Sequence, residues 1–327
     1  MNSLHRRTFG ALALAAAAFG PAAALAQADY PNRPVKVVVP FTAGGVVDAI
    51  ARLVGERLAA KYSQPFVIEN RTGAGGSIGT DFVAKSAADG YTLLCVSPGH
   101  AVVPSLVKGV TWNPVTDFRA VAGFGIIPNV IVVHPDVPVK TMSELVALAK
   151  AKPGEVTYAT AGAGTSNHLS GELFAQMAGL KLTHVPYKGQ PDAMNDLLGG
   201  RVTMMPLTAA IAAQHIKTGK LRALAVTTAR RSTALPELPT VAEAANLPGY
   251  EVGTWFGFVA PAKTPDAVVA KLAADIAEIL KSPEVKAKFD GMGMELAPQT
   301  PAQFDAFVAA ERTKWARVIQ QAGITPQ

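Results

Sequence analysis

Two short segments of the chain combine glycines with the beginning of a predicted helix, an arrangement suited to binding anions. Residues 41–48 follow the apolar run at 35–39, and residues 161–168 follow a predicted strand at 155–160. The first turn of a helix exposes unpaired N–H groups and the positive end of the helix dipole. Glycines let a loop turn further N–H groups toward a guest. Both segments therefore predict a site for a small anion, with a carboxylate as the expected ligand.

Several side chains near these loops have more than one plausible role. Thr165 or Ser166 can cap the following helix or donate to an oxyanion. His168 falls in the first helical turn, where contact with a ligand and a structural position are both open. Asp48 is better explained as an acid that interacts favourably with the helix dipole. Tyr187 follows another predicted strand and is a candidate to line the same cleft.

Enzymatic alternatives have weaker support. The segment Gly75-Gly-Ser77-Ile-Gly79 matches the G-x-S-x-G pattern of a hydrolase nucleophile. However, residues 70–74 already form a predicted loop between the preceding strand and Ser77, so the sharp turn directly from strand to serine is missing. The glycine loops do not complete G-x-G-x-x-G, and the six histidines include no pair with the spacing of a zinc site. A serine esterase is therefore an unfavoured alternative, and we expect no catalytic residue, metal or cofactor.

The order of apolar runs and helical patterns predicts an α/β fold with mainly parallel sheets and right-handed crossovers. A mature chain of about three hundred residues is long for a single core, so two lobes are expected. The helical C-terminal region suggests that the chain returns to its first lobe. The predicted lobes are residues 29–125 plus 250–327 and residues 126–249. Two crossovers, near 123–129 and 247–253, would form a hinge beside a ligand cleft.

Two local predictions concern the approach to this hinge. The segment from residue 97 to about residue 118 contains three prolines and is expected to be irregular. The apolar runs at 121–127 and 130–133 are expected to be separate strands, because Pro128 and Asn129 lie between them.

Residues 1–28 have the layout of a secretory signal peptide. Arg6 and Arg7 precede an alanine-rich run at 11–18 and small-residue cleavage sites, and no acidic residue occurs before Asp29. Both Sec and twin-arginine export fit this segment. The protein is therefore expected to be exported.

The net charge limits which classes of binding partner are expected, and the cysteine content indicates a single buried thiol. The formal net charge is +6, from 30 Lys plus Arg against 24 Asp plus Glu, and the positive residues are scattered along the chain. This pattern does not support a nucleic-acid partner, whereas a mildly positive surface suits an acidic small molecule. The single cysteine, Cys95, lies in an apolar run and is expected to be buried. We expect a monomer.

A set of short motifs spread over nearly the whole mature chain resembles the Bug (TctC-like) family of periplasmic substrate-binding proteins of tripartite tricarboxylate transporters. The motifs are Tyr30-Pro-x-Arg-Pro34, Val39-Pro-Phe-Thr-Ala-Gly-Gly45, Glu69-Asn-Arg-x-Gly-Ala-Gly-Gly76, Asp89-Gly-Tyr-Thr-Leu93, Val185-Pro-Tyr-Lys-Gly189, Gly219-Lys-Leu-Arg-Ala-Leu-Ala225 and Leu238-Pro-Thr-Val-Ala-Glu243. Their number and order make the resemblance specific.

The resemblance implies a type II periplasmic-binding-protein fold, a small organic carboxylate between two lobes, and membrane transporter components or a membrane sensor as partners. It also implies that the two glycine-containing loops grip the ligand. The ligand-binding residues expected from the resemblance and the loop chemistry together are Phe41, Thr42, Ala43, Gly44, Gly45, Val47, Asp48, Ala161, Gly162, Ala163, Gly164, Thr165, Ser166, His168, Tyr187 and Thr208.

The chain departs from the family pattern within these loops. Val46 and Val47 stand where a Gly-Thr-like pair is common, and Thr42-Ala43 replaces a common Pro-Pro. The segment ending at Thr208 lacks an acid that relatives often carry. The missing acid weakens the case for an amino-acid ligand and favours a plain or aromatic carboxylate.

Overall fold

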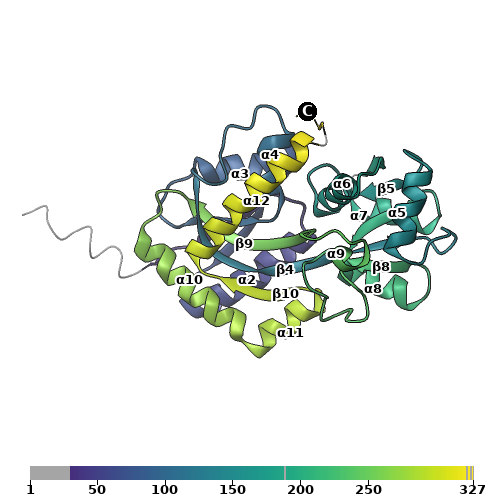
Figure 1. Cartoon of the computed structure of the whole chain (residues 1–327). Helices are drawn as coiled ribbons and strands as arrows, with labels where there is room; N and C mark the ends of the chain where they lie inside the picture. The colour runs from purple at the N-terminus through teal and green to yellow at the C-terminus, as the bar shows by residue number, and fades with distance from the viewer. Residues whose placement is uncertain (1–29, 188, 322, 325, 327) are drawn as a thin grey trace, which may run out of the picture.

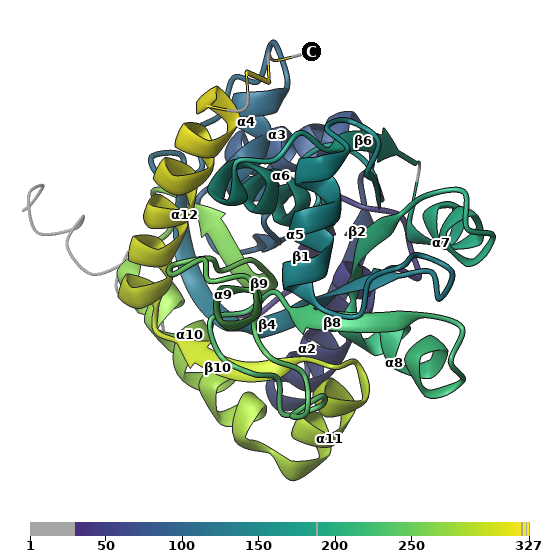
Figure 2. The same ribbon diagram turned by 45° about the vertical axis from the view of Figure 1, so that its right-hand side comes forward.

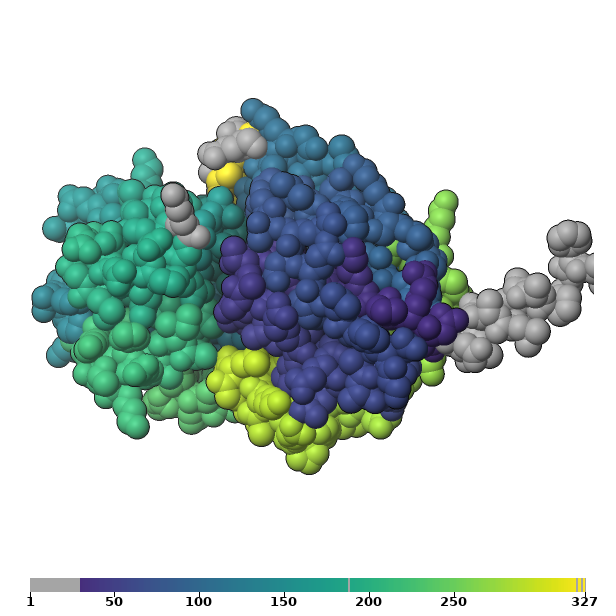
Figure 3. Space-filling model, turned by 180° about the vertical axis from the view of Figure 1, so that it is seen from behind, coloured from purple at the N-terminus to yellow at the C-terminus, as the bar shows by residue number. Residues whose placement is uncertain are grey.

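The structure, a computed structural model, describes residues 30–187, 189–321, 323–324 and 326. The predicted signal peptide, residues 1–28, lies outside the described residues. Two α/β lobes lie side by side and share one long strand (Figure 1). From behind, the second lobe, in teal and green, lies beside the purple and blue first lobe (Figure 3).

The first lobe is built on six strands in the order β2-β1-β3-β9-β4-β10. β1 pairs in parallel with β2 and β3, whereas β9 runs antiparallel to β3 and β4. The strands are β1 (Val35–Val39), β2 (Phe66–Asn70), β3 (Thr92–Val96), β4 (Phe118–Val133), β9 (Gly253–Pro261) and β10 (Glu295–Gln299).

Helices cover both faces of this sheet. The valines of β1 are all fully buried, as predicted for a central strand, and the apolar core continues into helices on either side. Cys95 of β3 is also fully buried, as predicted. One face packs against α2 (Val46–Tyr62), α10 (Asp266–Lys281) and α11 (Pro283–Gly291); the other packs against α3 (Ser77–Ala84), α4 (Gly99–Leu106) and α12 (Pro301–Gln321).

The second lobe is built on strands in the order β8-β4-β7-β5-β6. The parallel pairs β5–β6 and β5–β7 confirm the predicted β-α-β units. Figure 2 shows the helices around this sheet. The strands are β5 (Thr157–Thr160), β6 (Thr183–Pro186), β7 (Met204–Thr208) and β8 (Arg222–Val226), and the helices are α5 (Met142–Ala151), α6 (Ser166–Ala178), α7 (Gln190–Leu198), α8 (Ala209–Lys217) and α9 (Val241–Ala244).

β4 carries the chain from one lobe to the other without interruption. Its first part pairs with β9 up to Pro128, and its last part, from Asn129, pairs with β7 and β8. The prediction of two separate strands is therefore wrong, because β4 continues through Pro128 and pairs with β9 there. β4 pairs antiparallel with β7, β8, β9 and β10. The predicted parallel pairing is confined to strands β1, β2 and β3 of the first lobe and strands β5, β6 and β7 of the second.

The two crossings between the lobes are bonded to each other. The Thr227 N–H donates to the carbonyl of Asn129 at 2.9 Å, and the Thr227 hydroxyl donates to the carbonyl of Val252 at 2.6 Å. Thr227 thus ties the start of the second lobe's part of β4 to the segment that leads into β9.

Several elements were not predicted, among them α4 and β10. α4 occupies part of the segment expected to be irregular. It begins at Gly99 without a side-chain cap and contains Pro104, so the sequence signal for a helix start is missing and the proline argues against a helix. β10 is a short edge strand beside β4 and contains Pro298, whose missing N–H is tolerated at an edge. No helix in the described parts of the chain is both long and apolar enough to cross a bilayer.

Candidate functional site

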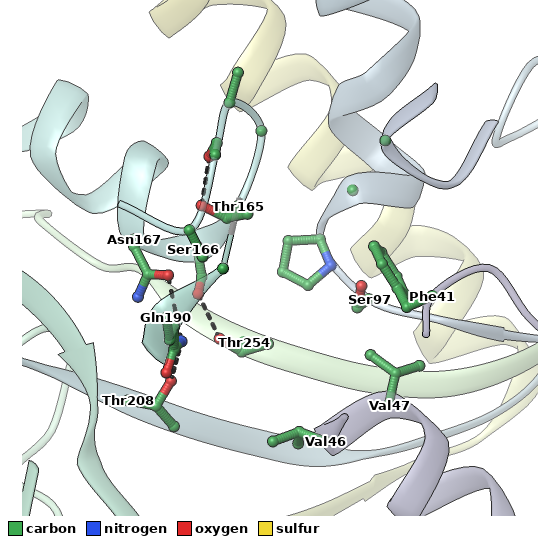
Figure 4. A pocket seen from close by; sticks show the side chains of 18 of the residues that line it. Phe41, Val46, Val47, Ser97, Thr165, Ser166, Asn167, Gln190, Thr208 and Thr254 are labelled. Atoms are coloured by element: carbon green, nitrogen blue, oxygen red, sulfur yellow. Dashed lines mark hydrogen bonds between the residues drawn. The ribbon is translucent and has the colours of Figure 1, made fainter. Parts of the chain in front are cut away.

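A cavity of about 500 Å³ lies between the two lobes. Its wall contains residues of both lobes and of the two strands that cross between them (Figure 4). The lining residues are Phe41, Val46, Val47, Gly75, Ser97, Pro98, Gly99, Val103, Ile127, Ala161, Gly162, Ala163, Gly164, Thr165, Ser166, Asn167, Tyr187, Gly189, Gln190, Thr208, Thr254 and Phe256.

Five helices begin at the wall of this cavity. α2 and α4 come from the first lobe, and α6, α7 and α8 come from the second. α2, α7 and α8 have no side-chain cap, so their first-turn N–H groups keep their donor capacity. In α4, the N–H groups of His100 and Ala101 already donate to the carbonyls of Ser97 and Pro98. Aligned peptide dipoles place a partial positive charge at each of these ends. The cavity is therefore suited to an anion that both lobes contact.

The described part of the lining carries no formal charge. None of the described residues that line the cavity is Asp, Glu, Lys, Arg or His. An anion here would be stabilised by neutral N–H and O–H donors in a partly dehydrated space, where such dipoles act more strongly than in water.

The second predicted loop is residues 161–168. All of its residues except the last, His168, line the cavity. Gly162 and Gly164 have φ of +116° and +78°, a left-handed region that explains why glycine stands at both positions. The Thr165 hydroxyl donates to the carbonyl of Gly162 at 2.7 Å and also caps α6. The prediction that Thr165 or Ser166 caps this helix is thus confirmed for Thr165.

His168 lies behind the loop and does not line the cavity. Its side chain is buried, and its Nδ1 accepts a hydrogen bond from the Gly164 N–H at 3.2 Å. Burial lowers the pKa of His168 to about 3, and the neighbouring His184 ring, 4.4 Å away, adds to this shift. His168 is therefore a neutral acceptor that holds the loop, the structural one of the two roles considered.

The first predicted loop contributes to the cavity only at its two ends. Phe41 and Val47 line it, and so does Val46, which was not among the predicted residues. The residues between them are exposed to solvent and lie outside the lining; they are Thr42, Ala43, Gly44 and Gly45. The chain turns outward here before α2 begins.

Asp48 also lies outside the lining and is almost fully buried. Its carboxylate accepts hydrogen bonds from the Gly44 N–H at 2.9 Å, from Asn70 Nδ2 at 2.9 Å and from Arg52 Nε at 2.9 Å. These bonds, led by that of Arg52, lower the pKa of Asp48 to about 2. Asp48 therefore anchors the first loop, consistent with the structural role that its position suggested.

The second lobe presents a connected group of polar side chains to the cavity. Gln190 Nε2 donates to Thr208 Oγ1 at 2.8 Å and to Asn167 Oδ1 at 3.3 Å. The Thr254 hydroxyl of β9 donates to Ser166 Oγ at 2.7 Å, which links the return strand to the start of α6. Figure 4 shows this polar group facing Phe41, Val46 and Val47 of the first lobe.

Tyr187 lines the cavity, as predicted, but its hydroxyl is engaged elsewhere. It donates to Asp196 Oδ2 at 2.6 Å. Burial, reinforced by Asp196, raises the pKa of Tyr187 to about 12. Tyr187 therefore offers its ring rather than a free hydroxyl to the cavity.

Sequence reasoning missed several polar lining residues. Gln190 directly follows one of the quoted family motifs, and Asn167 lies inside the second loop, so both had a local signal. Ser97 follows the last residue of β3, two residues before the unpredicted α4 begins. Thr254 reaches the cavity only because β9 passes between the lobes. No local sequence pattern indicates that Ser97 or Thr254 lines the cavity.

Ser77 does not form part of a hydrolytic site. It begins α3 after the short helix η1 (Ala74–Gly76), and its hydroxyl accepts a hydrogen bond from Trp112 Nε1 at 3.2 Å. No hydrogen bond joins Ser77 to a histidine in the part of the chain that the structure describes.

Comparisons with known proteins agree with this geometry. Residues 50–324 match TctC, the tripartite tricarboxylate transporter family receptor. Protein BugT of Bordetella pertussis is 38% identical over 97% of this chain and 98% of its own length. Among solved structures, Rpa4515 of R. palustris with adipate has a TM-score of 0.81 at 39% identity and covers 91% of this chain and 100% of its own. MatC from Rhodopseudomonas palustris with bound malate has a TM-score of 0.76 at 31% identity, covering 89% of this chain and 100% of its own.

These matches extend over almost all of the described chain, and they confirm the family and the fold expected from the motifs. The chain belongs to the TctC (Bug) family of solute-binding proteins and is not an enzyme.

Proposed function

We propose that this protein binds a small organic carboxylate between its lobes and delivers it to the membrane components of a tripartite tricarboxylate-type transporter. The observation that carries the proposal is the convergence of five helix N-termini on a cavity whose described lining residues are uncharged. Such ends bind carboxylates through N–H groups and through their dipoles, without a cationic side chain.

The volume of the cavity and the ligands of two similar structures support a small carboxylate as the ligand. A cavity of about 500 Å³ falls in the range of small-molecule sites. The similar structures with adipate and with malate each hold a small carboxylate. Of the predicted residues, the ten that line the cavity are proposed to contact the ligand: Phe41, Val47, Ala161, Gly162, Ala163, Gly164, Thr165, Ser166, Tyr187 and Thr208.

Closure of the lobes on the ligand is part of the proposal. The predicted lobes, residues 29–125 plus 250–327 and residues 126–249, would rotate about the bonded crossings at Asn129, Thr227 and Val252. The hydrogen bond from Thr254 to Ser166 lies at the cavity and would favour the closed arrangement. A ligand that contacts helices of both lobes adds to that preference.

The proposed location is the periplasm, where a monomer would meet its membrane partners. The signal-peptide pattern of residues 1–28 supports export, by the Sec or the twin-arginine route. A sensing role, in which the liganded protein docks on a membrane receptor, is the alternative. Deleting the transporter's membrane components separates the two: uptake of the ligand is lost under the transport proposal and persists under the sensing alternative.

Thermal unfolding against a ligand panel tests the binding role. The mature protein, stripped of co-purified ligand, is unfolded with mono-, di- and tricarboxylates, amino acids and aromatic acids. A ligand at about a hundred times its Kd stabilises the folded state by about 2.7 kcal/mol, which raises Tm by a few degrees in a chain of this size. The methyl ester of the same acid is the matched control and should give no shift. A flat response to every acid would contradict the proposal.

A further inference from the structure

The bond between His168 and the second loop requires one particular tautomer of the imidazole. His168 Nδ1 accepts a hydrogen bond from the Gly164 N–H at 3.2 Å, so Nδ1 carries no proton. Burial lowers the pKa of His168 to about 3, so the ring is neutral at pH 7 and carries its single proton on Nε2. The other tautomer would point an Nδ1–H at the Gly164 N–H. Two donors would then face each other, and the bond would be lost.

Glu172 lies where it favours the required tautomer. It follows His168 by one turn of α6, and its Oε1 lies 3.7 Å from His168 Nε2. This distance is long for a hydrogen bond, but at this range a carboxylate still attracts an N–H group and repels a nitrogen lone pair. Within the described parts of the chain, Glu172 is the one acid within 4 Å of a His168 ring nitrogen. It therefore stabilises the form of His168 that can hold Gly164.

Tyr158 of β5 fixes the position of this carboxylate. Its buried hydroxyl donates to the same Oε1 atom of Glu172. The contact depends on a close approach of α6 to β5 at Gly171, where a Cβ atom would lie 2.3 Å from Cε2 of the Tyr158 ring. Glycine is therefore required at this position for the two elements to pack. The carboxylate is held toward His168 by a buried donor from a neighbouring strand.

The conformation of the second loop is thus set by side chains behind it. The Gly164 N–H is bonded to His168, and the Gly162 N–H donates to Thr160 Oγ1 at 3.2 Å. Neither His168 nor Thr160 lines the cavity, whereas both glycines do. A loop that is already ordered loses less conformational entropy when a ligand binds. Side chains that never touch the ligand can therefore change its affinity.

We propose that Glu172 is a positioning residue for ligand binding: it holds His168 in the Nε2–H form, which keeps Gly164 bonded and the second loop in its binding conformation. The inference rests on the proposed function where it concerns affinity, because it assumes that a small carboxylate binds in the cavity. It goes beyond that function by naming a residue outside the cavity on which the affinity depends.

Titration calorimetry at pH 7 with adipate, malate, succinate and benzoate tests the effect on affinity. Glu172→Leu removes the acceptor and should weaken binding about fivefold or more, the loss expected for one hydrogen bond. Glu172→Gln keeps an oxygen for Tyr158 and His168 and should retain the native Kd. The matched control is Glu144→Leu, which removes the capping-box acid of α5 outside the cavity; it should lower Tm and leave Kd unchanged.

Nitrogen-15 NMR of the histidine-labelled protein tests the tautomer without any ligand. The His168 signals are identified by their loss in His168→Phe. The native chain and Glu172→Gln should show the proton on Nε2, and Glu172→Leu should show a mixture of the two tautomers. A change that only destabilised the fold, as in Glu144→Leu, would leave the tautomer as it is in the native chain.

Several results would overturn the inference. A native chain with the His168 proton on Nδ1 would do so by itself, even if Glu172→Leu failed to fold. Native affinity in Glu172→Leu would show that Glu172 does not position the loop. Equal weakening in Glu172→Leu and Glu172→Gln would exclude the acceptor role. Failure of every acid to bind the native chain would instead contradict the proposed function, and the tautomer measurement would still test the contact between Glu172 and His168.

Discussion

Replacing Asp48 by asparagine should destabilise the protein in a way that depends on pH. The carboxylate is almost fully buried and accepts bonds from Gly44, Asn70 and Arg52. Asn keeps the shape of the side chain and one acceptor, but it removes the negative charge that Arg52 faces. The first cleft loop would then lose the anchor that holds Gly44.

The lowered pKa of Asp48 gives the size of the expected loss in the free energy of unfolding. Its fall from 3.8 to about 2 corresponds to about 2.5 kcal/mol at neutral pH. The Arg52 side chain is 52% exposed, so solvent screening weakens its contribution. We therefore expect Asp48→Asn to lower the free energy of unfolding by about 1 to 2 kcal/mol at pH 7. Because the folded-state pKa is the lower one, this contribution is present above pH 3.8 and is lost as the pH falls toward 2.

Urea unfolding followed by tryptophan fluorescence, at pH 7 and at pH 3, measures this difference. The matched control is Asp81→Asn, which removes a partly exposed pair with Lys85 and should change the free energy of unfolding by less than about 0.5 kcal/mol. The reasoning is refuted if Asp48→Asn is as stable as the native chain at pH 7, or if its deficit is the same at both pH values.

Three further predictions follow from the same contacts. Thr254→Val removes the bond to Ser166 and should weaken carboxylate binding by about fivefold, measured by titration calorimetry; unchanged affinity would exclude a role for this bond in the bound state. Burial lowers the pKa of His100 from 6.5 to about 3, so the unfolded chain is protonated first as the pH falls below 6.5. The contribution of His100 to the free energy of unfolding should therefore drop by about 2 kcal/mol between pH 7.5 and pH 5. His100→Leu should remove that part of the pH dependence, whereas Val102→Ala in the same helix should lower stability equally at both pH values. Ser77→Ala should bind carboxylates normally, and neither it nor the native chain should hydrolyse activated esters; hydrolysis abolished by the substitution would restore the esterase alternative.

The predicted residues that do line the cavity are mostly those whose position a local sequence pattern determines. A buried strand followed by a glycine-containing loop and a helix places residues 161–166 at the carboxyl end of a strand, and the structure brings these residues to the cavity. In the first loop, only Phe41 and Val47 of the predicted residues line the cavity, because the pattern gives the position of the loop but not the direction in which Thr42 to Gly45 face.

The parts that sequence missed depend on long-range packing. Thr254 reaches the cavity because β9 returns between the lobes, and nothing near it in the chain indicates this path. α4 was missed because it has no side-chain cap and contains Pro104, whereas the burial of residues 100–103 that stabilises it depends on the fold. For His168, only the fold shows that the imidazole faces the backbone of its own loop instead of the cavity.

Blocking the cavity tests the central claim most directly. Val46 lines the cavity yet is 39% exposed, so Val46→Trp should fill the space between the lobes without disturbing the core. Val67→Trp, at a 51% exposed position of β2 outside the cavity, is the matched control. Titration calorimetry with the most stabilising carboxylate should show binding by the native chain and by Val67→Trp, and none by Val46→Trp. Native affinity in Val46→Trp, with its stability unchanged, would mean that the carboxylate binds elsewhere and would contradict the account.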